Sequence, residues 1–156
     1  MTERMVKKEI ISSSEKETEQ LAASFAEKAG PGIIALHGAL GAGKSVFARA
    51  FASALGVKGY MPSPTFTIAQ EYRIPKSKNI SFNTLYHLDL YRIKDSNAAF
   101  AFGIDEFLDD NYAVSLIEWP ERIADILPED TIHITFQHIN ESSRRITIEK
   151  EEQPQN

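Results

Sequence analysis

A glycine-rich segment in the first third of the chain has the residue types and the spacing needed to hold a polyphosphate. It reads Gly38, Ala39, Leu40, Gly41, Ala42, Gly43, Lys44 and Ser45, which is the pattern G-x-x-x-x-G-K-[ST]. Small residues allow a tight loop whose backbone N–H groups converge on phosphate oxygens at the start of a helix. The lysine adds a positive charge, and the serine hydroxyl is an oxygen ligand for a nucleotide-bound magnesium ion. The segment therefore predicts a nucleotide site.

The flanking residues predict the strand and the helix that such a loop requires. Residues 33–36 form an apolar run, and a helix is expected from about residue 46 to Leu55, with Gly56 as its end signal. Strand, glycine-rich loop and helix in this order are the context in which the motif binds phosphate. The alternative is a glycine-rich turn that binds nothing.

Hydrolysis of a nucleotide also needs carboxylates, and two are candidates. Glu118 follows the continuous apolar run 113–117, which is typical of a strand covered on both faces, and Asp89 ends the strand expected over 81–88. Ligands of open α/β sheets bind at the carboxyl ends of strands, so both residues are suited to magnesium, directly or through water. The alternative for each is an acid that caps the next element.

Thr65 lies in a segment that two prolines, Pro62 and Pro64, keep extended. Its hydroxyl or backbone could contact an outer phosphate, as switch loops do, and the alternative is an ordinary turn threonine. Arg92 and Arg122 are interpreted as surface ion-pair residues rather than as catalytic ones.

Composition limits the classes of function. The chain has 156 residues, a net charge of −5, no cysteine, and no apolar run near the length of a membrane span. The charged start lacks the apolar core of an export signal, so we expect a soluble cytoplasmic protein. Disulfides and thiolate metal sites are excluded. Because RNA binding normally needs a basic face, tight binding of RNA by this chain alone is not expected.

The remaining periodicities predict an α/β fold with a central, mainly parallel sheet, antiparallel strands at its edges and flanking helices. A helix is expected over 14–29, with capping-box spacing at its start. A short edge strand is expected at 6–11, and strands at 66–74 and 81–88 are expected to form a hairpin. Two half-buried strands are expected at 131–136 and 145–148. Residues 1–150 are predicted to be one domain, and 151–156 a disordered tail.

Four blocks in order resemble the bacterial TsaE ATPases, also called YjeE. They are Leu-Gly-Ala-Gly-Lys-Ser at 40–45, Ser-Pro-Thr-Phe at 63–66, His-Leu-Asp-Leu-Tyr-Arg at 87–92 and Ile-Glu-Trp-Pro-Glu-Arg at 117–122. The resemblance extends over about residues 7–150. It implies an ATPase that works with TsaB and TsaD to make threonylcarbamoyladenosine in tRNAs reading codons that begin with adenine. TsaD would carry the transfer chemistry and much of the tRNA contact, and neither DNA nor a membrane is implied as a partner.

The resemblance also assigns roles to residues of this chain. ATP or ADP would be bound by Gly38, Leu40, Gly41, Ala42, Gly43, Lys44, Ser45 and Val46. Lys44, Thr65, Asp89 and Glu118 would form the hydrolytic site, with Mg²⁺ held by Ser45, Glu118 and Asp89. Trp119 would support that site. The family usually has threonine where Ser45 stands and often a second threonine where Val46 stands. Ser45 keeps the needed hydroxyl, whereas Val46 has no side-chain donor for a phosphate.

Two other functions fit the same motifs. A kinase of a small metabolite would need an arginine-rich lid, and no such segment is visible in the sequence. A nucleotide-gated binding module would use the nucleotide only to set the shape of a docking surface.

Overall fold

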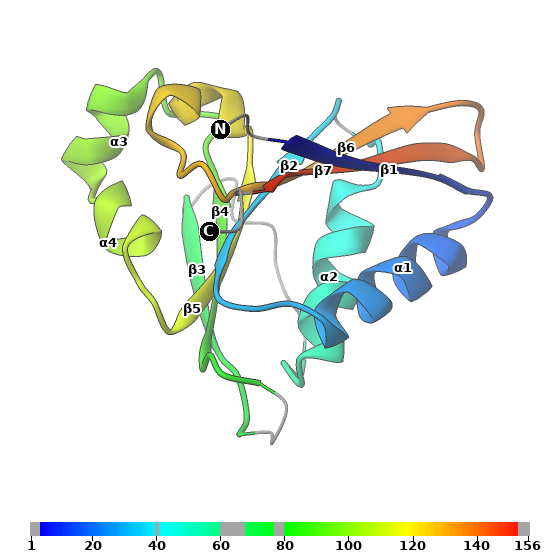
Figure 1. Ribbon diagram of the computed structural model, residues 1–156, viewed down its shortest axis with the longest axis horizontal. Coiled ribbons are helices and arrows are strands. Elements are labelled where there is room, and N and C mark those ends of the chain that lie inside the picture. The colour runs from blue at the N-terminus through cyan, green and yellow to red at the C-terminus, as the bar shows by residue number, and fades with distance from the viewer. Residues whose placement is uncertain (1–3, 40, 60–67, 77–79, 153–156) are drawn as a thin grey trace.

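The computed structural model describes residues 4–39, 41–59, 68–76 and 80–152, and Figure 1 shows their arrangement. Leu40 and Thr65, both predicted to belong to the site, lie outside the described residues. The strands are β1 (Arg4–Ser12), β2 (Gly32–His37), β3 (Ala69–Arg73), β4 (Thr84–Asp89), β5 (Ala113–Glu118), β6 (Ile132–His138) and β7 (Arg144–Glu152). The helices are α1 (Glu15–Glu27), α2 (Lys44–Ala54), α3 (Ser96–Phe102), α4 (Ile104–Leu108) and the 3-10 helix η1 (Pro120–Ile126).

Within the described residues the strands form one seven-stranded sheet in the order β1-β7-β6-β2-β5-β4-β3. The four central strands, β6, β2, β5 and β4, are mutually parallel. Both edges are antiparallel, through β1 with β7 and β7 with β6 on one side and β3 with β4 on the other. The predicted α/β fold, with a mainly parallel centre and antiparallel edges, is confirmed.

The parallel centre directs four strand ends to one edge of the sheet. The strand β2 stops at His37, immediately before the glycine-rich loop, and β4 and β5 stop at Asp89 and Glu118. Asp89 and Glu118 are register partners, and Leu36 of β2 is the partner of Glu118 on its other side. The loop and the two predicted carboxylates therefore meet at the carboxyl edge.

Helices cover both faces of the sheet, as Figure 1 shows. Alternate strand residues pack on opposite sides, so Ile34 and Leu36 join the core under α1 and α2, while Ile33 joins the core with α3, α4 and η1. Phe47 and Phe51 from α2 fill the first core and are fully buried. The helix that carries the lysine of the loop is thus anchored to the sheet.

The edge strand β1 is longer than the short strand that was predicted. Nine of its residues pair with β7, from Arg4 with Glu152 to Ser12 with Arg144. This pairing corrects the tail prediction, because β7 continues to Glu152 and residues 151–152 belong to the sheet. Backbone hydrogen bonds to β1 hold these charged residues in the strand, although their side chains give no apolar pattern.

Three helical elements between residues 96 and 126 were not predicted. Residues 96–102 and 104–108 form α3 and α4, separated by Gly103 at a φ of 100°. Each is too short to repeat an apolar period. Asp95 caps α3 by accepting a hydrogen bond from the Ala98 backbone N–H at 2.9 Å.

In the described part of the chain, no helix has the length and apolar character needed to cross a membrane.

Candidate nucleotide-binding site

The glycine-rich loop has a backbone path that side chains at two of its positions would disturb. Gly38 has a φ of 139°, and a Cβ added there would lie 2.6 Å from the carbonyl oxygen of Phe136 on β6. Gly43 has a φ of 113° and precedes the first residue of α2. Residues other than glycine rarely adopt these angles, so the loop depends on its glycines.

The N-terminus of α2 has the geometry that suits an anion. Its cap residue, Gly43, makes no side-chain hydrogen bond, and the first turn contains no acidic residue. Helix α1 differs, because Ser14 accepts from the Glu17 N–H at 3.1 Å and two acids lie in its first turn. The first N–H groups of a helix lack intrahelical partners and carry partial positive charge, so α2 offers its own to a ligand.

Lys44 is held at the start of α2 rather than extended into solvent. Its side chain is 5% exposed, and Nζ lies 5.0 Å from the centroid of the Trp119 ring. Trp119 follows β5 with a φ of 58° and ψ of 47°, left-handed values that are unusual for a bulky residue. A cation over an aromatic face is attracted by the ring's negative centre, so Trp119 positions the charge of Lys44 near the loop.

The two predicted carboxylates are both buried at the sheet edge. Glu118 is 7% exposed, and its Oε2 lies 2.8 Å from Nε2 of His87. Asp89 is 5% exposed, and its Oδ1 accepts a hydrogen bond from the Tyr91 N–H at 3.0 Å. Asp89 therefore caps the turn after β4, as its alternative interpretation proposed, while it also lies beside Glu118. Carboxylate oxygens are the type of ligand that Mg²⁺ prefers, so both residues keep the chemistry for which they were predicted.

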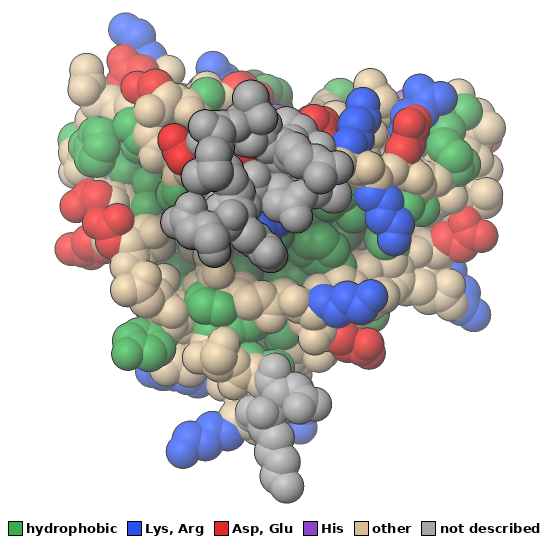
Figure 2. Space-filling model, in the orientation of Figure 1, with side chains coloured by type: hydrophobic (Ala, Val, Ile, Leu, Met, Phe, Trp, Pro, Cys, Tyr) green, Lys and Arg blue, Asp and Glu red, His purple; other side chains and the backbone are tan. Residues whose placement is uncertain are grey.

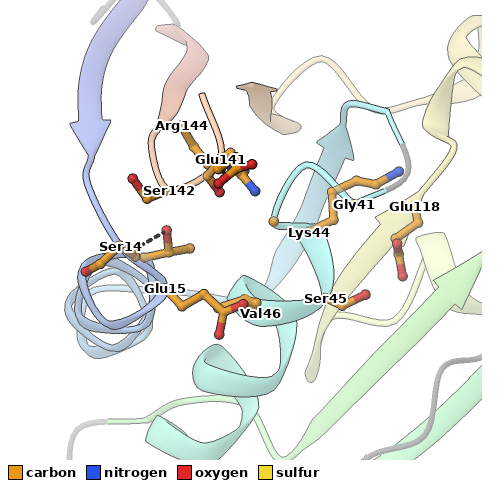
Figure 3. A pocket seen from close by; sticks show the side chains of 12 residues that line it. Ser14, Glu15, Gly41, Lys44, Ser45, Val46, Glu118, Glu141, Ser142 and Arg144 are labelled. Carbon is orange, nitrogen blue, oxygen red and sulfur yellow. Dashed lines mark hydrogen bonds between the residues drawn. The ribbon is translucent and has the colours of Figure 1, made fainter. Parts of the chain in front are cut away.

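A pocket of 470 Å³ opens over the loop, and Figure 3 shows the side chains around it. One wall consists of the predicted residues Gly41, Gly43, Lys44, Ser45, Val46 and Glu118. Gly38 and Ala42, also in the loop, do not line the pocket, and Ala42 is buried. The structure thus brings six of the predicted residues to one cavity, with Asp89 next to Glu118 in the sheet.

The opposite wall of the pocket was not predicted. It comes from the start of α1 and the turn between β6 and β7, and it consists of Ser14, Glu15, Thr18, Glu141, Ser142 and Arg144. Figure 3 shows Ser14 and Arg144 on the opposite side of the cavity from Glu118, and the Lys44 side chain extends away from them toward Glu118. These segments are separate from the loop in sequence and carry no phosphate-binding motif. Only the sheet order, which places β6 beside β2, brings them to the pocket.

Two histidines lie under the loop, on adjacent strands. Nε2 of His37, the last residue of β2, is 2.9 Å from Nδ1 of His133 on β6. Burial lowers the pKa of both histidines below 6.5, and the neighbouring His133 lowers the pKa of His37 further. Glu121 and Glu149 oppose this effect on His37, whereas Lys44 adds to it. The pair favours neutral rings, because one ring must donate and the other accept.

This pair predicts a loss of stability in acid. The unfolded chain binds protons near pH 6.5, whereas the folded pair resists them, so the free energy of unfolding should fall as the pH drops below about 6.5. Replacing His133 with glutamine should make this fall shallower, as measured by urea unfolding at pH 7.5 and pH 5.5. His138→Gln, at an exposed position on the same strand, is the matched control. An equally steep fall in His133→Gln and the unchanged chain would contradict the prediction.

The charges on the surface are mixed. Figure 2 shows Lys and Arg side chains interspersed with Asp and Glu side chains on the face that it draws. The net charge of the whole chain is −5. A protein that binds nucleic acid through its phosphates normally has a concentrated basic face. The mixed charges on the face drawn in Figure 2 do not form one.

The fold and the pocket define a class of α/β proteins in which a glycine-rich loop joins a buried parallel strand to a helix and faces carboxylates from neighbouring strands. Comparison with known proteins identifies the family. The family model described as Threonylcarbamoyl adenosine biosynthesis protein TsaE matches residues 12–146. The chain belongs to the TsaE family, whose role is in tRNA threonylcarbamoyladenosine biosynthesis. The resemblance seen in the sequence is confirmed.

Individual relatives support this assignment along most of the chain. The tRNA threonylcarbamoyladenosine biosynthesis protein TsaE of Bacillus subtilis (strain 168) is 37% identical over 85% of this chain and 79% of its own length. That of Aquifex aeolicus (strain VF5) is 38% identical over 90% of this chain and 95% of its own. The crystal structure of YdiB from Bacillus subtilis matches with a TM-score of 0.75 and 30% identity, over 94% of this chain and 87% of that one.

Proposed function

We propose that this protein is the ATP-hydrolysing subunit that supports formation of threonylcarbamoyladenosine in tRNAs reading codons that begin with adenine, acting with TsaB and TsaD. The observation that carries the proposal is that buried Lys44 and buried Glu118 line one pocket at the carboxyl edge of the parallel sheet. A cation for phosphates and a carboxylate for magnesium are the two parts that hydrolysis requires on the protein.

The residues of the loop suit the phosphates of ATP or ADP. The uncapped N-terminus of α2 offers backbone N–H groups, and Lys44 offers a positive charge beside them. A side chain at Gly38 would collide with backbone, which fits a loop shaped for close approach. Val46 has no hydroxyl for a phosphate oxygen, so the backbone and Lys44 carry this contact.

Ser45 and Glu118 suit a nucleotide-bound magnesium ion, since both line the pocket and both present oxygen. Asp89 is the register partner of Glu118, and we propose that it holds a water of the same magnesium ion. Magnesium in such a site neutralises charge on the transferred phosphoryl group. Thr65 is proposed to complete the hydrolytic site from the proline-containing segment.

The wall that sequence did not predict is proposed to hold the nucleoside. Its residues, from the start of α1 and the β6–β7 turn, face the loop across the pocket. The volume of 470 Å³ lies within the range of small-molecule sites, about 300–1,000 Å³. Arg144 is fixed there because its Nη1 donates to the carbonyl of Asn140 at 2.9 Å.

The acidic net charge fits a division of labour in the proposed complex. A chain with charge −5 is not suited to neutralise many tRNA phosphates by itself. We therefore propose that tRNA is contacted through the complex, with TsaD supplying the transfer chemistry, and that the protein acts in the cytoplasm.

The test is the release of free phosphate from ATP and Mg²⁺ by the purified chain, alone and with TsaB and TsaD of the same organism. We expect weak release alone and a faster release with the partners, both lowered at least about 100-fold in Lys44→Ala. If ATP binds but the partners do not raise the rate, a nucleotide-gated module becomes the better explanation. Phosphate transfer from ATP to a small acceptor would instead indicate a kinase.

Removing the proposed magnesium ligand should lower the affinity for magnesium. Glu118→Gln keeps the size of the side chain but removes its charge, so the Mg²⁺ concentration for half-maximal phosphate release should rise at least about ten-fold. Glu121→Gln, at an exposed position of η1 three residues later, should leave it unchanged. An unaltered magnesium dependence in Glu118→Gln would exclude this ligand.

A further inference from the structure

His87 is a buried residue to which sequence analysis gave no role. It lies on β4 two residues before Asp89, so both side chains are on the same face of the sheet. Its register partner on β5 is Leu116, two residues before Glu118. The ring is 3% exposed. His87 thus lies two register pairs before the two carboxylates, on the same face of the sheet and away from the strand ends.

The contact between His87 and Glu118 has a defined direction. Nε2 of His87 and Oε2 of Glu118 are 2.8 Å apart. An ionised carboxylate only accepts hydrogen bonds, so Nε2 carries the hydrogen and donates it. Nδ1 of the same ring is buried and makes no hydrogen bond to any residue in the described part of the chain. A bare Nδ1 is less unfavourable there than an unpaired N–H, which agrees with a hydrogen on Nε2.

This hydrogen bond restricts the carboxylate at the pocket. It uses one oxygen of Glu118, and a carboxylate has a second oxygen with which to bind a cation. Glu118 lines the pocket together with Lys44 and Ser45. A donor that fixes a ligating carboxylate lowers the entropy lost when the metal binds, and residues in this position are known to change metal affinity.

We propose that His87 is a positioning residue for magnesium: it donates from Nε2 to Glu118 and so holds the carboxylate in the orientation in which it binds the nucleotide's metal ion. The inference rests on the proposed nucleotide function, because it gives His87 its effect through Glu118. If His87 were only a buried polar residue of the sheet, its loss would change stability and not magnesium affinity.

The test measures ADP binding by titration calorimetry over a series of Mg²⁺ concentrations, and also in EDTA. ADP avoids turnover during the measurement. His87→Leu removes the donor, and we expect the Mg²⁺ concentration for half-maximal enhancement of ADP affinity to rise about ten-fold. Affinity in EDTA should change by less than about two-fold, because Lys44 and the loop are untouched. His87→Gln retains an amide donor and should remain within about three-fold of the unchanged chain.

A double variant tests whether the effect passes through the carboxylate. In a Glu118→Gln background, His87→Leu should add less than about two-fold, because a residue that acts through Glu118 has nothing left to orient. A further ten-fold loss there would overturn the proposal. So would an unchanged magnesium dependence in His87→Leu, or an equal loss in His87→Leu and His87→Gln.

Two controls separate other causes. Thermal unfolding without ligand shows whether each variant is folded; if His87→Leu does not fold, His87→Gln decides, and a ten-fold loss in that variant overturns the proposal. The unchanged chain and Lys44→Ala test the proposed function itself. If the unchanged chain binds no ADP under any condition, the proposed function fails and the role of His87 fails with it. If it binds with magnesium dependence and His87→Leu shows the same half-maximal Mg²⁺ concentration, only the role of His87 fails.

Discussion

Lys44→Ala is expected to lower the rate of phosphate release from ATP by at least about 100-fold, with or without partner proteins. The side chain is 5% exposed at the N-terminus of α2 and lies against the Trp119 ring, so its charge is preorganised in a place with little water. Removing one preorganised charge or donor that acts on developing charge typically costs about 10²–10³ in rate. The measurement is phosphate release at saturating Mg²⁺, with ADP affinity determined in parallel.

The control for this prediction is a lysine of the same chain outside the pocket. Lys28 is exposed at the C-terminal end of α1, away from the pocket, and Lys28→Ala should keep the full rate. Thermal unfolding of both variants would show that the fold is intact. If Lys44→Ala retains more than about a third of the rate, Lys44 does not contact the transferred phosphate. Loss of a charge beside the transferred group would lower the rate much more than about three-fold.

Gly38→Ala is expected to be among the most destabilising single substitutions in this chain. Two costs combine, because alanine is strained at a φ of 139° and its Cβ would lie 2.6 Å from the Phe136 carbonyl oxygen. Backbone strain and overpacking together predict a loss of about 2–4 kcal/mol in the free energy of unfolding. For a domain of this size that loss lowers the melting temperature by about 5–15 °C.

Two other glycines separate these costs. Gly32 has a φ of 142° with no heavy atom within 4 Å of an added Cβ, so Gly32→Ala reports strain alone. Gly30 has equally open space and no positive φ, and Gly30→Ala should change stability by about 0.5 kcal/mol or less, or raise it slightly. If Gly38→Ala and Gly32→Ala melt at the same temperature, the close approach of β6 to the loop does not constrain residue 38.

The parts of the fold that sequence predicted well are those with a strong local signal. The helix expected over 14–29 is α1 at 15–27, because Ser14 caps it and Gly30 with Pro31 follows. The run 113–117 is the fully buried strand β5, and the predicted hairpin is the antiparallel pair β3 and β4. Alternation, capping and prolines act over a few residues, so they can be read from the chain directly.

What sequence did not predict depends on contacts between distant segments. The helices α3 and α4 are too short to show a period, and their place is fixed by the second core, through residues such as Ala99 and Ile104. The far wall of the pocket, with Ser14 and Arg144, depends on the order of strands in the sheet. The hydrogen bond from His87 to Glu118 crosses two strands that are paired only in the folded sheet. None of these has a signature in a single stretch of residues.

The pairing of β1 with β7 has a consequence for how the chain acquires its pocket during synthesis. Ser12 pairs with Arg144, roughly 130 residues later, and closing so long a loop is entropically costly and slow. The ribosome makes β1 early, and its sheet partner β7 follows only after every other strand has emerged. One wall of the pocket contains Ser14 just after β1 and Arg144 at the start of β7, so a nascent chain has its phosphate loop long before it has a complete cavity. Newly made protein therefore completes this cavity only after β7 has been synthesised, when its first strand finds its partner.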